Sequence, residues 1–152
     1  MNSKKDARIL PPTYLFVSLL AMLGMHYLLP ITQLVPKPWI LLGILPLASG
    51  IVINIFADKL FSRAKTTINS FGEPTTIITD GIYSATRNPM YLGMALLLLG
   101  VAILLGSLSP FFVVPVFVWL ITVRYIRFEE KMLEDTFGLK YLDYARRVRR
   151  WI

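Results

Sequence analysis

The sequence predicts an all-α integral membrane protein with four transmembrane helices, and three observations lead to this fold class. Hydrophobic residues make up 55% of the 152 residues and charged residues only 16%, against about 25% charged in an average soluble domain. The apolar residues gather in four runs, as expected where helices of about 20 residues cross a bilayer. All sixteen Lys and Arg residues lie outside these runs. The length allows one membrane domain, 1–152, and excludes large soluble modules.

Two spans are predicted in residues 1–60. The first, 13–31, is an uncharged run behind a polar and basic N-terminus. It is longer than the apolar part of a typical signal peptide, and no small-residue cleavage pattern follows it, which favours a membrane helix over a cleaved leader. The second, 39–56, is entered through a proline-rich link and contains Pro46, where we expect a bend or break.

Residues 61–89 are predicted to form one long cytoplasmic loop. Ser, Thr, Asn, Gly and Pro are frequent in it, and a polar stretch of this composition does not continue a membrane helix. Asp80 and Gly81 predict a turn shortly before the chain re-enters the membrane.

The rest of the chain predicts a helical hairpin, 90–127, and an amphipathic cytoplasmic tail, 128–152. Only five residues, 106–110, join the third apolar run, 90–105, to the fourth, 111 to about 123, so their helices should pack antiparallel. Phe137 followed by Gly138 predicts a break between two helices of the tail. The sequence has neither strand–helix alternation nor a Gly-x-Gly-x-x-Gly pattern, so we expect no Rossmann sheet.

The basic residues predict the orientation. If the N-terminus is cytoplasmic, fifteen of the sixteen Lys and Arg residues lie inside and only Lys37 lies outside, as the positive-inside rule requires. We therefore expect a multi-pass protein of a prokaryotic plasma membrane with both termini in the cytoplasm. Orientation and anionic membrane lipids account for the net charge of +7. The basic run 146–150 therefore needs no nucleic-acid partner to explain it.

The first polar segment that could carry chemistry is Arg87-Asn88-Pro89. The sequence contains no cysteine, so thiolate metal sites and a cysteine nucleophile are excluded, and no metal site is predicted. Asn is a favoured N-cap and Pro a favoured first helical residue, so a helix start alone would explain this segment. The free backbone N–H groups and positive dipole end beside Arg87 would also suit a carboxylate or phosphate.

The second segment places Arg124 and Arg127 on one helical face, followed by Glu129 and Glu130. One interpretation is structural, with snorkelling arginines and surface ion pairs that contribute about 0.2–0.5 kcal/mol each. The other is functional, because acidic groups at a membrane-helix end that face protein are costly. Adjacent residues cannot share one helical face, so one glutamate should point toward the bundle and the other toward water or a partner.

Four motifs follow one another in the second half of the chain. They are Gly81-x-Tyr83, then Arg87-Asn88-Pro89-x-Tyr91-x-Gly93 at a helix start, then Glu129-Glu130-x-x-Leu133, then Phe137-Gly138-x-x-Tyr141-x-x-Tyr144. In this order they resemble the isoprenylcysteine carboxyl methyltransferase and phospholipid methyltransferase superfamily, over about 75–150. The resemblance implies methyl transfer from S-adenosylmethionine to a lipophilic acceptor at the cytoplasmic membrane face, with S-adenosylhomocysteine as product.

The resemblance also implies which residues form the site. Arg124 or Arg127 would orient the acceptor, and Glu129 or Glu130 would close the cofactor pocket. Eukaryotic members commonly have His where this chain has Asn88, and asparagine can contact the cofactor but cannot titrate. The implied cofactor-binding residues are Thr76, Ile77, Ile78, Tyr83, Arg87, Asn88, Pro89, Met90, Tyr91, Glu129 and Glu130.

The nature of the acceptor stays open at this point. An isoprenylcysteine-like carboxylate is the leading choice, and a phospholipid or other amine is the alternative within the superfamily. An NADPH-dependent enzyme is a second possibility, because integral-membrane sterol reductases resemble this region. A non-catalytic membrane scaffold is the third.

Three polar or small-residue features in the spans favour structural roles. His26, the single histidine, is expected to be a packed and hydrogen-bonded helix residue. For Asn54 and Asp58, an interhelical hydrogen bond is favoured over contact with the methyl acceptor. The small residues Ala102 and Gly106 predict close helix packing.

Overall fold

The computed structural model describes residues 10–64 and 76–152. In these two ranges every regular element is a helix, and the only β-type pairing is an isolated bridge between Gln33 and Ser107. The predicted all-α class is therefore confirmed for the described residues. Part of the basic N-terminal segment and part of the predicted loop lie outside them. The elements are α1 (Pro11–Leu28), η1 (Trp39–Gly43), α2 (Ile44–Ala64), η2 (Gly81–Ser84), α3 (Pro89–Leu105), η3 (Ser109–Phe112), α4 (Val113–Ile121), η4 (Thr122–Ile126), α5 (Arg127–Phe137) and α6 (Leu139–Arg147).

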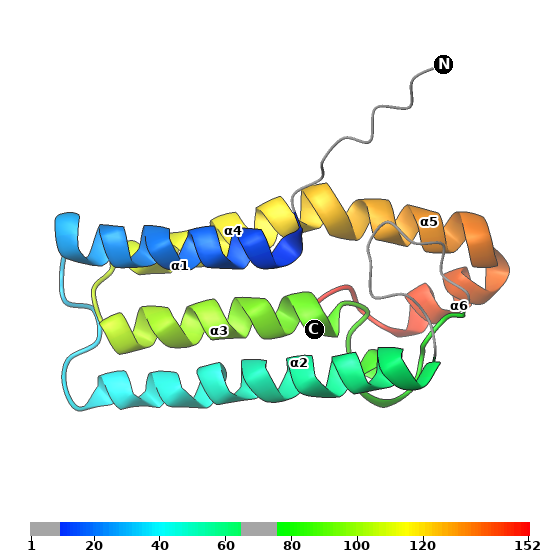
Figure 1. Cartoon of the computed structure of the whole chain (residues 1–152), viewed down its shortest axis with the longest axis horizontal. Coiled ribbons are helices and arrows are strands. Elements are labelled where there is room, and N and C mark those ends of the chain that lie inside the picture. The colour runs from blue at the N-terminus through cyan, green and yellow to red at the C-terminus, as the bar shows by residue number, and fades with distance from the viewer. Residues whose placement is uncertain (1–9, 65–75) are drawn as a thin grey trace, which may run out of the picture.

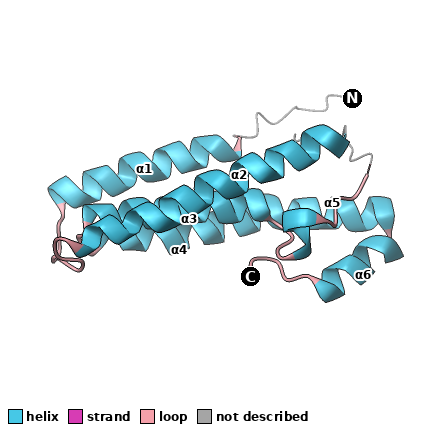
Figure 2. Ribbon diagram, turned by 90° about the horizontal axis from the view of Figure 1, so that it is seen from below, coloured by secondary structure: helices cyan, strands magenta, loops and turns pink. Residues whose placement is uncertain are grey.

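Four long helices lie side by side in a bundle, and α5 and α6 extend from one end of it (Figures 1 and 2). Helix α2 packs against α3, while α1 packs against α3 and α4. Helices α3 and α4 form the predicted hairpin, because Gly106 ends α3 with a φ of +75° and the chain turns back at once.

Helices lie in all four predicted apolar runs, but they differ in length, and α1 ends at Leu28, before the predicted end of the first run at residue 31. Within the described ranges, Trp39–Leu60 and Ser109–Phe137 are long and apolar enough to cross a membrane, whereas the apolar helix Pro89–Leu105 is shorter. Much of the bundle's outer surface is apolar, with Leu45, Phe56 and Trp119 each more than half exposed. Exposed apolar surface on this scale belongs against lipid, so the chain is a membrane protein.

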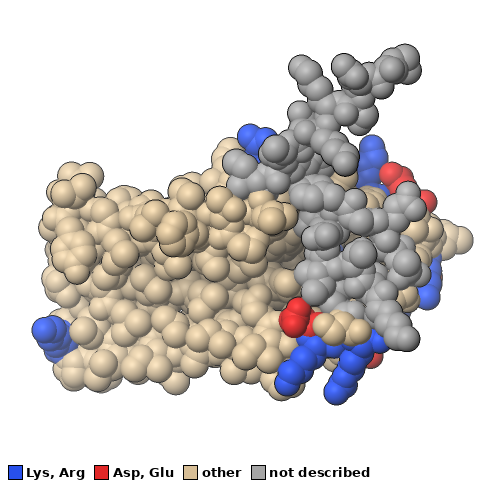
Figure 3. Space-filling view, in the orientation of Figure 1, with Lys and Arg blue, Asp and Glu red and all other residues tan. Residues whose placement is uncertain are grey.

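Charged side chains gather at the end of the molecule that carries α5 and α6 (Figure 3). Lys37 lies in the connection between α1 and α2, at the opposite end. This separation along the bundle matches the separation of charge that the sequence indicates.

A close helix contact joins η1 and α2 to α3 through glycines spaced seven residues apart. A Cβ atom added to Gly43 would lie 2.5 Å from the carbonyl oxygen of Gly100, and one added to Gly50 would lie 2.5 Å from that of Gly93. Such a separation admits no side chain on either helix. The prediction of close packing at Ala102 holds, since that residue is fully buried. At Gly106 the close contact is with the connection after α1, because an added Cβ would lie 2.7 Å from Gln33 Nε2 and 2.8 Å from the Val35 carbonyl oxygen.

Two boundaries differ from the prediction. Helix α2 continues past Asp58 to Ala64, so the predicted loop 61–89 starts with helix. The fourth span does not end at residue 123, because α4, η4 and α5 form one continuous helix, in which η4 is a π-helical segment. The predicted break after Phe137 is confirmed, with Gly138 at a φ of +52° between α5 and α6.

Candidate functional site

The site lies where the start of α3, the first turn of α5 and the C-terminal segment meet. Pro89 is the first residue of α3, and Asn88 occupies the N-cap position. The Asn88 side chain makes no capping bond there. Its Nδ2 instead donates to the carbonyl oxygen of Arg150 at 3.0 Å, and its backbone N–H donates to Thr86 Oγ1 at 3.2 Å. The N-cap explanation of Asn88 is therefore wrong as to its side chain.

The C-terminal segment pairs with the residues just before α3. The backbone N–H of Arg87 donates to the carbonyl oxygen of Arg149 at 3.0 Å, and Thr86 Oγ1 donates to that of Arg150 at 3.3 Å. Trp151 then packs against the main core cluster. Sequence reasoning did not place this segment in the site, because a basic C-terminal run is also what membrane orientation demands.

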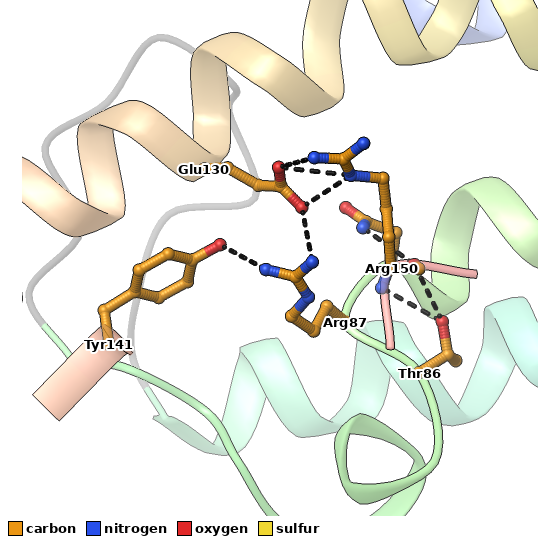
Figure 4. Close-up of polar contacts among 6 residues, drawn as sticks. Thr86, Arg87, Glu130, Tyr141 and Arg150 are labelled. Carbon is orange, nitrogen blue, oxygen red and sulfur yellow. Dashed lines mark hydrogen bonds and ion pairs between the residues drawn. The ribbon is translucent and has the colours of Figure 1, made fainter. Parts of the chain in front are cut away.

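Glu130 is held between two arginines (Figure 4). Arg150 donates from Nε to both carboxylate oxygens, at 3.0 and 3.2 Å, and from Nη2 at 2.6 Å. Arg87 Nη2 lies 3.3 Å from Oε1 of the same carboxylate. The hydrogen bonds to Glu130 raise the pKa of Arg150.

Arg87 keeps unused donor capacity. Its Nη1 donates to the Tyr141 hydroxyl at 3.2 Å, and its side chain is 14% exposed. Its Nε is buried and has no hydrogen-bond partner among the described residues. With two arginines against one glutamate, the cluster has a net charge of +1. A positive, partly buried cluster with an unpaired donor suits an anionic group.

Glu129 turns toward a different set of residues. It accepts a hydrogen bond of 2.6 Å from the hydroxyl of Tyr91, a buried residue in the first turn of α3. The ring of Tyr91 lies 6.4 Å from that of Tyr125, which is itself 5.6 Å from that of Tyr14 on α1. The prediction that one glutamate faces water or a partner was wrong, since both are partly buried and bonded. The first turn of α5 lies between α3 and the C-terminal segment. Glu129 therefore contacts α3 while Glu130 contacts the C-terminal segment.

Tyrosines from η2 and α6 lie next to the arginine cluster, where the Tyr141 hydroxyl accepts the hydrogen bond from Arg87. The Tyr144 hydroxyl donates to the carbonyl oxygen of Tyr83 at 2.6 Å. Burial raises the pKa of Tyr144 to about 12 and also raises the pKa of Tyr83. Desolvation likewise raises the pKa of Tyr141. At neutral pH these hydroxyls are therefore protonated donors rather than bases.

The other predicted site residues occupy different positions. Thr76, Ile77, Ile78 and Met90 are half-buried, and Ile77 packs against the cluster of Tyr141 and Tyr144. Arg124 and Arg127 are exposed, and the cations that contact Glu130 are Arg87 and Arg150 instead. An acceptor-orienting role for Arg124 or Arg127 stays a prediction.

The polar residues of the spans lie apart from the arginine cluster. His26 Nδ1 and Ser107 Oγ are 2.7 Å apart at the opposite end of the bundle, as expected of a packed, hydrogen-bonded residue. Asn54 Nδ2 donates to the carbonyl oxygen of Gly50 in its own helix, at 2.9 Å. The predicted interhelical hydrogen bond of Asn54 is therefore replaced by an intrahelical one, with the amide lying against Gly93 of α3.

Comparison with known proteins identifies the family of the chain. A family model described as phospholipid methyltransferase matches residues 38–140. The chain belongs to the phospholipid methyltransferase family. This family member is 32% identical over 72 residues to protein-S-isoprenylcysteine O-methyltransferase B of Arabidopsis thaliana, covering 47% of this chain and 36% of the relative. It is 33% identical over 72 residues to protein-S-isoprenylcysteine O-methyltransferase of Schizosaccharomyces pombe, covering 47% of this chain and 30% of the relative.

A third relative is bacterial. An uncharacterized protein of Haemophilus influenzae is 38% identical over 63 residues, which is 41% of this chain and all of the relative. The family member thus spans about a third of the length of the two named methyltransferases. No solved structure matches it.

Proposed function

We propose that the chain is an S-adenosylmethionine-dependent methyltransferase that acts on a lipophilic acceptor at the cytoplasmic face of the membrane. One observation carries the proposal. The separated motifs that resemble the superfamily, around residues 81–93, 129–133 and 137–144, come together at one end of the helical bundle. The named relatives, protein-S-isoprenylcysteine O-methyltransferases, support the same reaction class.

The residues present fit S-adenosylmethionine chemically. The unpaired Nε of Arg87 and the net charge of its cluster suit the carboxylate of the methionine part. Glu129, with its Tyr91 partner, can accept hydrogen bonds from hydroxyl or ammonium groups. The half-buried Ile77 and Ile78 offer apolar surface to an aromatic base. When bound, S-adenosylmethionine supplies a sulfonium-activated methyl group and leaves as S-adenosylhomocysteine.

The protein's own task is to align the reacting groups and exclude water. The arginine cluster binds the anionic end of its ligand, while Glu129 and Asn88 orient neighbouring groups. A carboxylate acceptor needs no general base, so Tyr83 and Tyr144 can stay protonated and donate hydrogen bonds. An amine acceptor must first lose a proton, and Glu129, a partly buried carboxylate bonded to the Tyr91 hydroxyl, would accept it.

The proposal includes a membrane arrangement in which α1, α2, α3 and α4 all cross the bilayer as one domain. The exposed apolar surface of the bundle and the charged end with α5 and α6 support this topology. Both termini would lie in the cytoplasm. The soluble cofactor would then enter from the cytoplasm and a lipid-like acceptor from the bilayer, between helices.

Calorimetry of the purified protein in detergent tests the cofactor. We expect saturable binding of S-adenosylmethionine, and its absence together with binding of NADPH would favour a reductase instead. Membranes that contain the protein, incubated with a labelled methyl donor, test the acceptor by mass spectrometry of the product. A labelled carboxyl ester supports an isoprenylcysteine-like substrate, and a labelled amine supports phospholipid N-methylation. Cofactor binding without any methylated product would point to a non-catalytic role.

A further inference from the structure

The C-terminal segment 148–151 contacts both Asn88, just before α3, and Glu130, in the first turn of α5. An apolar side chain anchors the segment at each end. Val148 is buried in the cluster formed by Tyr141 and Tyr144. Trp151 packs against the main core of the bundle. Between these apolar anchors, the backbone of the segment faces the residues that precede α3. The segment is therefore an integral part of the site.

The backbone of Arg150 sets the orientation of Asn88. Its carbonyl oxygen accepts hydrogen bonds from Asn88 Nδ2 at 3.0 Å and from Thr86 Oγ1 at 3.3 Å. A carbonyl oxygen can only accept, so the amide nitrogen of Asn88 must face it. The amide oxygen of Asn88 then faces away from this carbonyl and can serve as a hydrogen-bond acceptor.

The side chain of Arg150 sets the position of Glu130. Its planar fork makes three contacts of 2.6 to 3.2 Å with the carboxylate, which also pairs with Arg87. A bidentate arginine fixes both the place and the plane of a carboxylate, which a lysine cannot do. One residue thus holds two predicted cofactor contacts, Asn88 through its backbone and Glu130 through its side chain.

Arg149 provides a natural comparison within the same basic run. Its carbonyl oxygen accepts a hydrogen bond from the Arg87 backbone N–H, but its side chain is exposed. Replacing the Arg149 side chain changes the charge of the run by the same amount as replacing that of Arg150. It leaves every contact with Glu130 and Asn88 intact.

We propose that Arg150 is a positioning residue for the methyl-donor site, where it fixes Glu130 and Asn88 in the orientation that binds the cofactor. This inference rests on the proposed function. The basic C-terminal run then has two parts, with Arg150 serving the site and its exposed neighbours serving membrane orientation.

Three variants of the full chain test this role: Arg150→Gln, Arg150→Lys and Arg149→Gln. The dissociation constant for S-adenosylmethionine is measured by calorimetry. The values of kcat and KM are measured with the acceptor that the mass-spectrometry experiment identifies. We expect Arg150→Gln to raise the dissociation constant and KM about tenfold, as for loss of one charge-assisted contact. Arg150→Lys should fall between this variant and wild type, and Arg149→Gln should stay within about twofold of wild type. At saturating cofactor, kcat of Arg150→Gln should change by less than about threefold.

The outcomes separate positioning from a merely structural role. A structural role would lower the amount of folded, active protein and hence kcat, while the dissociation constant of the folded fraction stayed at the wild-type value. That result, or an equal weakening in Arg149→Gln, would overturn the inference. If Arg150→Gln does not fold, Arg150→Lys decides by the same two quantities. Wild-type protein that binds no S-adenosylmethionine would refute the proposed function itself, whereas wild-type binding with unchanged Arg150 variants would refute only the positioning role.

Discussion

Replacing Glu130 with glutamine tests the central cluster directly. The substitution removes the negative charge and places an amide N–H₂ group opposite two guanidinium groups, which have no acceptor to offer it. Breaking a buried ion pair costs about 3–5 kcal/mol, whereas an exposed pair contributes about 0–1 kcal/mol. The side chains of Glu130 and Arg87 are 15% and 14% exposed, and that of Arg150 is 39% exposed. The site therefore lies between these limits, and we expect Glu130→Gln to destabilise the fold by about 2 kcal/mol.

Glu134→Gln is the matched control, because Glu134 lies one turn further along α5 and is exposed. Both variants lose one negative charge from the same helix. Unfolding of the purified proteins in detergent, followed by circular dichroism, measures stability, and calorimetry measures affinity for S-adenosylmethionine. Glu130→Gln should unfold more readily and bind the cofactor more weakly than Glu134→Gln. Equal stability and equal affinity of the two variants would show that the arginine–glutamate cluster neither stabilises the fold nor contributes to cofactor binding.

Three further predictions address the helix contact, the tyrosines and the second glutamate. Gly50→Ala should destabilise the bundle by about 1–3 kcal/mol, because the new Cβ would lie 2.5 Å from the Gly93 carbonyl oxygen. Gly24→Ala is the control and should not destabilise it, because the space around that Cβ is open. Equal unfolding curves for the two variants would refute the contact. The native state keeps the Tyr144 proton up to a pKa of about 12 against 10.0 ordinarily, so stability should be constant below pH 10 and fall as the pH rises toward 12. Tyr144→Phe should flatten that fall, and an unchanged slope in pH-dependent unfolding would contradict it. Glu129→Gln should weaken S-adenosylmethionine binding in calorimetry while leaving unfolding near wild type, and full affinity would remove Glu129 from the site.

The helices could be predicted from the sequence because each leaves a local signal. Apolar runs without charge mark the four long helices, and Gly138 marks the break between α5 and α6. Local rules also placed Asn88 and Pro89 at the start of α3, where the structure has them. The use of the Asn88 side chain was not predictable in this way. Its partner, Arg150, is 62 residues further along the chain, and no helix-start rule contains that information.

The contact between α2 and α3 was missed for a related reason. Gly43, Gly50, Gly93 and Gly100 look like ordinary glycines of apolar helices when each helix is considered alone. Only the register between the two helices turns the seven-residue spacing into a pair of close approaches. Ala102 and Gly106 were singled out because they are small and one turn apart, but Gly106 ends its helix. Spacing within one helix therefore indicates that a close contact is possible, and the partner helix decides where it forms.

The division between Glu129 and Glu130 follows from the same long-range pairing. In sequence the two are equivalent neighbours, and helical periodicity predicts that only one can face protein. The C-terminal segment packs on a second side of this helix turn. Glu130 therefore contacts Arg150 and Arg87, while Glu129 contacts Tyr91. The two carboxylates therefore differ in the groups that hold them. Two guanidinium groups hold Glu130 in place, whereas Glu129 accepts a hydrogen bond from the Tyr91 hydroxyl.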